Sequence, residues 1–285
     1  MIDVKMHCED VTNFEEDVFV RAFSYKDYSI EIHNHEFYEI NIVLSGSGTH
    51  CIEDGKIEVS AGDVFVIPPM VAHGYIDTKN LEVYHIIIKK DFLTRNSEEA
   101  RHVKGFLEFI EIEPFLRSNF SNAVFLHLSF TQLAKFCSNI EFIDDKSEFN
   151  STEFLPIRYH TVWKILYWFS SLLTEQIKTM EKSNDKKYEA QIIDVLNYIH
   201  NHYAEKISID VLCKKTYLSR STFLRAFFDV CGQSPIEYLN KYRSQKAAEL
   251  LDNTSCSKTQ IAHSCGFYDL SHMERIMRKY NAKNT

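Results

Sequence analysis

The chain has 285 residues, of which 45% are hydrophobic and 25% charged, and a formal net charge of −8 at pH 7; this length favours two domains, and the apolar content is enough for two cores. The charge is unevenly divided along the chain. Residues 186–285 carry 15 lysines and arginines and 10 acidic residues, whereas residues 1–185 carry 17 and 30. Only the C-terminal part therefore has the excess of positive charge that contact with nucleic acid requires. The seven cysteines are odd in number and form no CxxC pair, which argues against a disulfide framework and a zinc ribbon and suits free thiols in a reducing cytosol.

The first hundred residues predict β structure. The acidic N-terminus lacks a cationic start and an apolar core, so we expect no signal peptide. Residues 18–90 hold short runs rich in Val, Ile, Tyr and Phe, with Gly, Asp, Asn and Pro between them, as strands and turns require. Because no helical segment separates these runs, residues 1–96 are expected to form a barrel or a sandwich. The runs are VFVRAF, YSIEIH, YEINIVL, KIEV, DVFVIP and LEVYHIIIK.

Two short motifs in this region carry polar side chains. The first has HxHxxxE spacing, and the second, GDVFVIPP at 62–69, is followed by a histidine. Both resemble the motifs of the cupin barrel, although Met70 and Asp77 stand where the second motif often has glycine and asparagine. The polar side chains of the two motifs are His33, His35, Glu39 and His73.

These four side chains allow different kinds of site. Alternate residues of a strand share a face, so His33 and His35 can point together into a barrel. Three imidazoles and one carboxylate can hold Fe, Mn, Ni or Zn, whereas a few convergent polar groups within apolar walls suit a small organic ligand. We expect the four residues to line an effector pocket. A divalent metal site is a less favoured alternative. The simplest alternative is that these side chains only form hydrogen bonds with one another or with the protein in the barrel mouth. No catalytic residue or cofactor is expected.

Residues 97–181 predict mostly helices. Apolar side chains at 162–177, two tryptophans among them, recur at intervals of three and four, which is typical of an amphipathic helix with a broad apolar face. The longest apolar stretch, 162–173, is interrupted by a lysine and two serines and is too short and too polar to span a membrane. The face suits packing on the barrel, a two-fold dimer seam, or both. Residues 182–188, which begin KSNDKK, are polar and aperiodic, and we expect a linker there.

A first helix-turn-helix pattern runs from 207 to 235. Ser208 is a suitable N-cap for a short helix at 210–215, and Ser219 opens a second helix. The apolar face of this second helix is formed by Phe223, Leu224 and Phe227, which fall on one side at 3.6 residues per turn.

A long connecting helix follows at once. Gly232 ends the preceding helix, because a left-handed C-cap needs a residue without Cβ. Ser234 and Glu237 form a capping box with a proline at the first helical position, and the helix runs to about residue 252. Arg243 falls on its apolar seam. Since a buried cation is costly unless it is paired, we expect an acidic or carbonyl partner for Arg243 between the two halves.

A second helix-turn-helix pattern repeats this logic. Ser257 and Gln260 form a capping box for a helix that ends at Gly266, and Ser271 with Glu274 forms a third box for a helix running towards residue 280. Two methionines lie on the apolar stripe of this last helix, where the second helix of the first pattern has two phenylalanines. Because methionine specifies packing weakly, we expect the second helix of the first pattern to dominate affinity. The stripe consists of Met273, Ile276, Met277 and Tyr280.

These elements resemble the arabinose-regulator (AraC/XylS) family of bacterial transcription factors. The matching stretches, in family order, are LSRSTFLRAFFDVCGQSPIEYL (218–239), YRSQKAAELL (242–251) and IAHSCGFYDLSHMERIMRKY (261–280). The resemblance implies that the second helix of each pattern enters the major groove of DNA. It also implies a cupin-like N-terminal domain, which is usual in this family.

By the same resemblance, the two recognition helices supply the contacts to DNA. The candidates for base edges are Ser221, Thr222 and Arg225 in the first helix and Ser271, His272 and Arg275 in the second. The candidates for phosphates are Arg220, Arg278 and Lys279. An arginine that reads guanine discriminates against the wrong base by about 1–3 kcal/mol. The alternative for these cations is an ordinary solvated helix face.

The expected fold is α+β: a cupin-like barrel at 1–96, a helical region at 97–181, a linker at 182–188 and an all-α domain of two helix-turn-helix motifs at 189–285. The expected function is transcription regulation in the cytoplasm, by resemblance as an activator, and not catalysis. The expected partners are promoter DNA, a small effector such as a sugar, RNA polymerase and a second copy of the chain, with no membrane. Two alternatives stay open, a metal-dependent cupin with catalytic or metal-sensing activity, and a regulator whose second motif has lost its DNA affinity and acts through protein contacts.

Overall fold

The chain forms two compact units, Met1–Thr179 and Met180–Thr285. The computed structural model describes residues 17–25, 29–52, 55–95, 100, 102–119, 126–140, 152–181 and 188–281. The expected linker at 182–188 lies outside the described residues except for Tyr188, and so does the C-terminal AKNT.

Two features of the described residues bear on the expectations from composition. The six cysteines in this part of the chain are all free. None of the helices described combines the length and the apolar character that a membrane-spanning segment needs.

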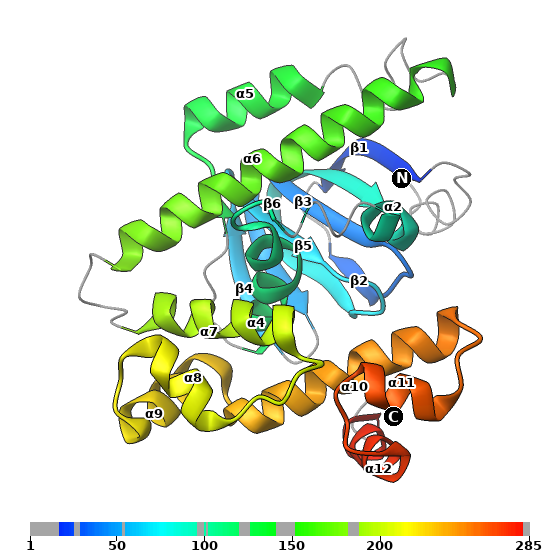
Figure 1. The fold of residues 1–285 in the computed structure, drawn as a ribbon. Coiled ribbons are helices and arrows are strands. Elements are labelled where there is room, and N and C mark those ends of the chain that lie inside the picture. Colours follow the sequence, from blue (N-terminus) through cyan, green and yellow to red (C-terminus); the bar gives the residue numbers. More distant parts are fainter. Residues whose placement is uncertain are drawn as a thin grey trace. The chain divides into compact units, whose positions relative to one another are not determined.

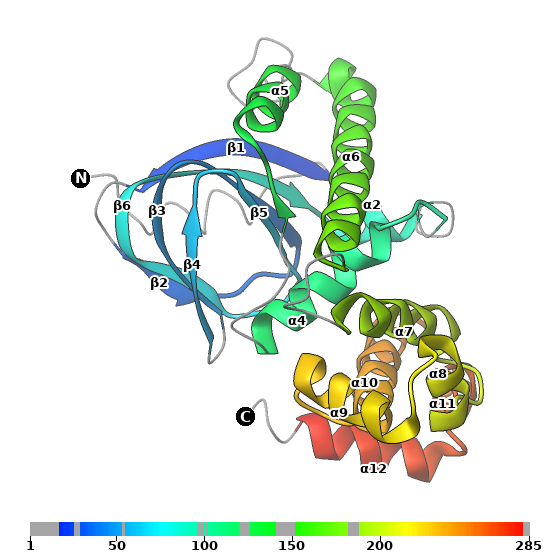
Figure 2. The same cartoon turned by 90° about the vertical axis from the view of Figure 1, so that its left-hand side faces the viewer.

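The N-terminal unit is built on an antiparallel sheet in which seven strands are described (Figure 1). The strand order is β1-β6-β3-β5-β7, with β2 also paired to β6 and β4 to β3. Figure 2 shows the strands curling round a common interior, as expected for a cupin-like barrel. The strands are β1 (Val18–Tyr25), β2 (Ile30–His33), β3 (Tyr38–Ile52), β4 (Gly55–Ser60), β5 (Asp63–Ile67), β6 (His73–Ile88) and β7 (Leu126–His127).

All six predicted runs contain a strand, but two strands are much longer than predicted. β3 continues to Ile52, and its register with β6 shifts at several points after Val43, so the strand bends where bulges interrupt the pairing. β6 begins at His73, well before the run LEVYHIIIK. The short β7, in a region predicted to be helical, pairs with β5 through Asp63 and His127. The sheet therefore extends beyond residue 96.

Met70 and Asp77 both adopt the left-handed backbone conformation, with φ of 65° and 54°. These are the positions at which the cupin motif often has glycine and asparagine, the residues that enter this conformation at least cost. The chain thus departs from the motif in its side chains and keeps the backbone geometry that the motif serves.

Apolar side chains fill much of the space inside the sheet. They come from five strands, so residues distant in sequence meet in one core. This core consists of Ile30, Val43, Val59, Phe65, Ile67, Tyr75, Leu81 and Val83.

Helices complete the N-terminal unit, and the longest of them buries the apolar face predicted at 162–177. Phe169 on this helix lies 5.8 Å from Phe109 and 5.7 Å from Phe136 between ring centroids, and Phe136 in turn contacts Tyr84 of β6. The face therefore packs within its own unit. The helices are α2 (Lys90–Arg95), η1 (Glu108–Ile112), α4 (Glu113–Asn119), α5 (Phe130–Ile140), η2 (Thr152–Phe154) and α6 (Leu155–Glu181).

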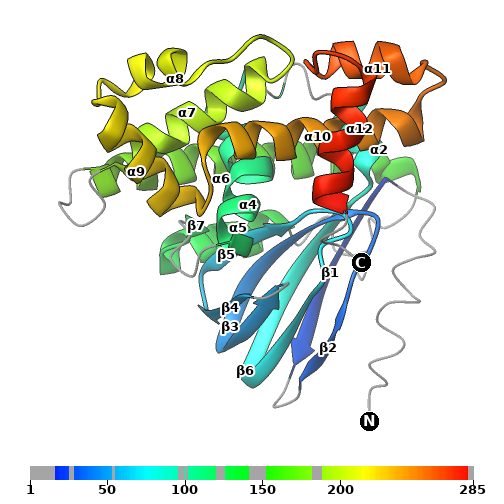
Figure 3. The ribbon, with the colours of Figure 1, turned by 90° about the horizontal axis from the view of Figure 1, so that it is seen from below.

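The C-terminal unit is helical (Figure 3). α7, α8 and α9 pack together at one end of α10, and α11 and α12 pack together at its other end. This is the predicted arrangement of two helix-turn-helix motifs joined by a long helix. The helices are α7 (Glu189–His202), α8 (Ile209–Thr216), α9 (Arg220–Cys231), α10 (Pro235–Asn253), α11 (Lys258–Ser264) and α12 (Leu270–Asn281).

Most of the predicted helix caps are confirmed. Ser208, Ser219, Ser234 and Ser257 each accept a hydrogen bond from the backbone N–H three residues on, at 3.2–3.3 Å, and the last two complete capping boxes. Gly232 ends α9 in the left-handed conformation, and its N–H donates to the carbonyl oxygen of Phe228 at 2.7 Å. These caps satisfy backbone groups that a helix leaves unpaired at its ends.

The third predicted capping box is wrong. α12 begins at Leu270, and the N–H of His272 donates to Oδ1 of Asp269 at 2.7 Å, so Asp269 is the cap. Ser271 lies exposed in the first turn. Asp269 is as good an N-cap as a serine, and its negative charge is stabilised by the positive end of the helix. Glu274 is therefore an exposed residue of the helix and not part of a cap.

The predicted carbonyl partner of Arg243 is confirmed. Its side chain is buried, with Nε donating to the carbonyl oxygen of Tyr203 and Nη2 to that of Glu205, both at 2.7 Å. Gly266, with φ of 75°, packs against the same group, because a Cβ there would lie 2.8 Å from Nη2 of Arg243 and 2.7 Å from the carbonyl oxygen of Ala204. One buried cation thus joins α10 to the ends of α7 and α11.

Candidate functional site

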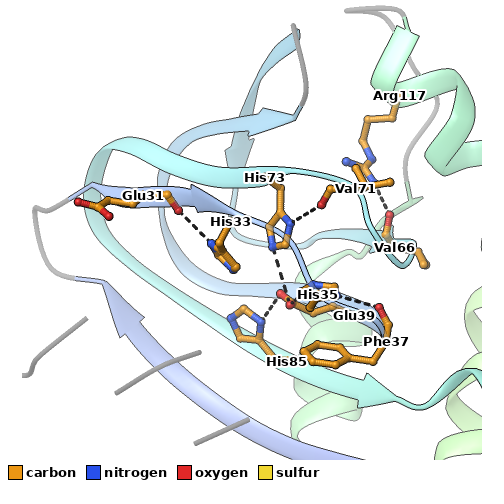
Figure 4. A network of polar contacts seen from close by, with 10 residues as sticks. All are labelled: Glu31, His33, His35, Phe37, Glu39, Val66, Val71, His73, His85 and Arg117. Carbon is orange, nitrogen blue, oxygen red and sulfur yellow. Dashed lines mark hydrogen bonds and ion pairs between the residues drawn. The ribbon is translucent and has the colours of Figure 1, made fainter. Parts of the chain in front are cut away.

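Glu39 lies at the centre of a cluster of histidines inside the barrel (Figure 4). Its Oε1 lies 2.5 Å from Nδ1 of His85, and its Oε2 lies 3.0 Å from Nε2 of His35 and 3.8 Å from Nε2 of His73. All four side chains are buried. Strands β3 and β6 place Glu39 and His85 on neighbouring rows of one face, since Glu39 pairs with Ile87 in the ladder. Three of the four predicted pocket residues therefore meet.

His33 borders this cluster without reaching its carboxylate. Its ring centroid lies 4.4 Å from that of His73 and 6.3 Å from that of His35, and its Nδ1 lies 2.9 Å from the carbonyl oxygen of Glu31. Within the described residues, the side chains whose ligand atoms all lie within 4.8 Å of one another are His35, Glu39 and His73. The predicted four-residue constellation is thus a triad flanked by His33 and His85.

Backbone contacts fix the ring nitrogens of this triad. Nδ1 of His35 lies 2.8 Å from the carbonyl oxygen of Phe37, and Nδ1 of His73 lies 3.1 Å from that of Val71. Because a carbonyl oxygen only accepts, both Nδ1 atoms carry the proton, and Nε2 of a neutral ring then presents a lone pair. This is the arrangement by which metal-binding histidines are oriented.

Burial and charge set the protonation of the cluster. Burial by itself would raise the pKa of Glu39, but the nearby His85, His35 and His73 hold that pKa well below its usual range. Burial lowers the pKa of His73 to about 4 although Glu39 opposes the shift. An ionised Glu39 oxygen 3.0 Å from a lone pair of His35 is repulsive, and a cation held between the two side chains would relieve this repulsion.

A second group of buried polar side chains lies in the same interior and was missed from the sequence. The ring of His50 lies 4.9 Å from that of Tyr75 and 4.7 Å from that of Phe65. Arg117 of α4 places its guanidinium carbon 4.9 Å from the centroid of Phe65. Strand alternation could have assigned His85 to the interior together with Val83, whereas the bulges of β3 after Val43 put His50 out of phase with Glu39. No local pattern points to Arg117, whose partner Val66 is 51 residues away.

The two recognition helices present their candidate residues in the same order. With Ser219 and Asp269 as N-caps, Arg225 and Arg275 both stand six residues after the cap, and both are exposed. Ser221 and Ser271 correspond in the same way, as do Thr222 and His272. The position four residues after the N-cap is buried in both helices, where it is occupied by Phe223 and Met273. The motifs therefore expose equivalent faces.

The predicted phosphate-binding cations are exposed and partly paired. Nη1 of Arg220 lies 2.5 Å from Oδ1 of Asp210, and Nζ of Lys279 lies 3.8 Å from Oε1 of Glu237. Arg278 donates from Nε to the carbonyl oxygen one turn earlier, at 3.3 Å. Exposed ion pairs contribute little stability, so DNA phosphates can displace these carboxylates at small cost.

Two exposed aromatic residues lie just before the recognition helices. Tyr217, in the left-handed conformation that ends α8, is 97% exposed, and Tyr268 is 85% exposed. Single exposed aromatic residues are common on protein surfaces, so exposure by itself assigns no role to either ring. The sequence offered a signal for both, since each ring stands in the turn of its motif.

Comparison with known proteins gives two family matches on this chain. A model described as an AraC-like ligand binding domain matches residues 17–129, and one described as a helix-turn-helix domain matches residues 212–283. The first covers the barrel with its polar interior, and the second covers both recognition helices.

Similar full-length proteins include HTH-type transcriptional activators named RhaS. That of Escherichia fergusonii is 26% identical over 249 residues, which is 87% of this chain and 83% of the relative, and one from Escherichia coli is 25% identical over 248 residues with the same coverage. Among solved structures, the DNA-binding domain of AdpA in complex with a target DNA is 27% identical, covers 31% of this chain and 80% of that one, and has a TM-score of 0.31.

Proposed function

Because the chain belongs to the AraC family of transcription regulators, we propose that it binds promoter DNA sequence-specifically and activates transcription when a small effector occupies its N-terminal barrel. The relatives named RhaS are described as transcriptional activators, which supports activation rather than repression. These relatives are regulators and not enzymes, and no catalytic role is assigned to this chain.

The observation that carries the proposal is the equivalence of Arg225 and Arg275. Both stand on the first two turns of a second helix in a helix-turn-helix, both are exposed, and both follow an N-cap by six residues. A side chain at this place can reach base edges in the major groove, and an arginine can donate two hydrogen bonds to guanine. Two such residues on one chain support reading of a bipartite site.

The remaining contacts follow from position along each helix. Ser221, Thr222, Ser271 and His272 lie in the first turns, where side chains of a recognition helix approach the bases. Arg220, Arg278 and Lys279 are assigned to phosphates, which fix register and contribute salt-dependent affinity.

The barrel supplies the regulatory half of the proposal. We assign it a sugar or related metabolite, bound through polar side chains that include His33, His35, Glu39 and His73. The effector shifts the regulator between two states only by the difference of its affinities for them. We assign the chain to a cytoplasmic homodimer that presents two DNA-binding units and contacts RNA polymerase. In such a dimer, the shift between the two states changes transcription.

The test is genome-wide mapping of the sites bound by the tagged chain, with transcript levels measured in the same cells. We expect discrete sites beside promoters, and lower transcription of the adjacent genes when the chain is deleted. The double variant Arg225→Ala, Arg275→Ala should lose these sites, whereas Lys178→Ala, which removes an exposed cation from the N-terminal unit, should keep them. A wild-type chain without discrete sites contradicts the proposal, and transcripts that rise on deletion contradict activation alone.

A second candidate function, metal sensing or metal-dependent catalysis in the barrel, is favoured by the geometry of His35, Glu39 and His73. The ligand atoms of His35, Glu39 and His73 lie within 4.8 Å of one another. Because Nδ1 of each histidine contacts a backbone carbonyl oxygen, Nε2 is the ring nitrogen that can bind a metal. Such a donor set fits Fe, Mn, Ni or Zn. A bound ion would also relieve the repulsion between His35 and Glu39.

Metal analysis of the purified chain decides this second candidate. Stoichiometric metal in the wild type and in His102→Gln, an exposed histidine, together with its loss in Glu39→Gln, would support it. A wild type that holds no stoichiometric metal after expression in supplemented medium rejects it, and leaves the transcriptional proposal unchanged.

A further inference from the structure

Among the buried polar atoms that lack a hydrogen-bond partner in the described part of the N-terminal unit, four belong to three neighbouring side chains. They are Nδ2 and Oδ1 of Asn41, Nε2 of His50 and Nη1 of Arg117. The three residues are 0%, 1% and 2% exposed. A buried polar atom without a hydrogen-bond partner destabilises a folded protein, so an arrangement of this kind points to a partner that arrives from outside the chain.

Phe65 brings these three side chains together. Asn41 on β3 is the direct ladder partner of Phe65 on β5, and directly paired residues lie on the same face of a sheet. The ring of His50 lies 4.7 Å from that of Phe65, and the guanidinium carbon of Arg117 lies 4.9 Å from the same centroid. Arg117 also contributes, after burial, to the lowered pKa of His50. The three side chains that carry the unsatisfied atoms therefore lie around one aromatic ring.

The charge of Arg117 is already compensated within the chain. Its Nε donates to Oε1 of Glu113 at 2.8 Å, and its Nη2 donates to the carbonyl oxygen of Val66. What remains is a donor at Nη1, and not an unpaired positive charge that needs an anion. The guanidinium of Arg117 can therefore receive a neutral oxygen.

The set of atoms around Phe65 both donates and accepts. Asn41 offers an N–H donor and a carbonyl acceptor, Arg117 offers a donor, and His50 offers one or the other according to its tautomer. A hydroxyl group does both, so neighbouring hydroxyls can satisfy all of these atoms. A carboxylate only accepts and would leave Oδ1 of Asn41 unmatched. The C–H faces of a hydroxylated ring can pack on the aromatic ring of Phe65.

We propose that Asn41, His50 and Arg117 recognise the effector and that this effector is an uncharged polyhydroxylated molecule. The assignment rests on the proposed function, in which the barrel holds the effector. It adds three recognition residues outside the two cupin-like motifs to Glu39 and its histidines, which adjoin them because His85 is the direct ladder partner of Asn41.

The test compares thermal unfolding of the full-length chain and its Asn41→Leu variant. Leucine keeps nearly the shape of asparagine and removes both unmatched atoms, so the ligand-free variant should unfold about 2–4 °C higher than the wild type. Both tryptophans lie in the N-terminal unit, so their fluorescence reports its unfolding. The probes are neutral aldohexoses and deoxyhexoses, with the corresponding uronates at equal concentration.

We expect at least one neutral sugar to raise the unfolding temperature of the wild type and of Ile42→Leu, the adjacent residue on the opposite face of β3. The same sugar should not stabilise Asn41→Leu or His50→Phe. The proposal is overturned if ligand-free Asn41→Leu unfolds at a lower temperature, if it keeps the sugar-induced rise, if only uronates stabilise the wild type, or if no probe does.

Binding of the mapped promoter sites, measured on the same preparations, separates this inference from the proposed function. If the wild type binds the promoter sites but any of those contrary outcomes occurs, the role of the three residues or the ligand class is rejected. The proposed function as a transcription regulator is then unaffected. A wild type that does not bind the promoter sites contradicts the proposed function itself.

Discussion

The side chain of Arg243 donates from Nε to the carbonyl oxygen of Tyr203 at 2.7 Å. Tyr203 follows directly after α7, in the first helix-turn-helix half, whereas Arg243 lies on α10 and touches the turn at Gly266 in the second half. The two halves of the C-terminal unit therefore share one buried, charge-assisted contact. This contact ties the end of α7 and the turn at Gly266 to α10.

Removing this guanidinium should destabilise the C-terminal unit. Arg243→Met leaves the carbonyl oxygens of Tyr203 and Glu205 without their donor, and we expect a loss of about 2–4 kcal/mol in the free energy of unfolding. Urea unfolding followed by far-ultraviolet circular dichroism measures it. Gln245→Met, at an exposed position of the same helix, should change stability by no more than about 0.5 kcal/mol. Equal stability of the two variants would contradict the structural role of Arg243.

Local chemistry made much of the C-terminal unit predictable. Ser219, Ser234 and Gly232 act through backbone groups within four residues of themselves, so the caps could be read from short stretches of sequence. The same reasoning erred at Ser271, because two capping residues compete there and the choice depends on where the chain enters α12. Sequence alone does not order Asp269 before Ser271.

The site inside the barrel was only partly predictable, for the opposite reason. Strand alternation brought His35, Glu39 and His73 into view, and the cupin-like motifs named them. Arg117 reaches Val66 and Phe65 from a helix about fifty residues away, and such a contact is fixed by tertiary packing. The pairing of β7 with β5 is equally non-local, which is why a two-residue strand in a helical region was missed.

Asp269 and Ser271, the two candidate N-caps of α12, should differ in their effects on stability and on DNA binding. Asp269→Ala should cost about 1 kcal/mol of stability, since it removes the side chain that accepts from the N–H of His272. Ser271→Ala should leave stability within about 0.5 kcal/mol and weaken DNA binding only. Chemical unfolding of the two variants, side by side, checks the assignment. A larger loss of stability at Ser271 than at Asp269 would restore the original capping box.

The N-terminal unit should lose stability as the solution becomes acidic. Burial lowers the pKa of His73 from its ordinary 6.5 to about 4, so the unfolded chain takes up this proton at a higher pH than the folded chain. The contribution is complete above pH 6.5 and is lost as the pH falls to about 4, with a total of about 3 kcal/mol. Glu39 and His50, whose pKa values are also lowered, act in the same direction.

Urea unfolding followed by tryptophan fluorescence at several pH values between 7 and 4.5 measures this dependence. His73→Gln cannot take up the proton and should flatten the loss over this range. His102→Gln, which replaces an exposed histidine, should follow the wild type. If His73→Gln loses stability as steeply as the wild type, the buried neutral state of His73 is not the cause.

Reading of DNA by two equivalent arginines is tested most directly by equilibrium affinity for a promoter site found by mapping. Fluorescence anisotropy at fixed salt should show Kd rising about 5- to 150-fold for Arg225→Ala and, independently, for Arg275→Ala, with discrimination relaxed at a different base pair in each case. Lys178→Ala should leave Kd unchanged. A loss confined to Arg225→Ala would mean that the second motif acts through protein contacts, and unchanged affinity in both variants would contradict the account.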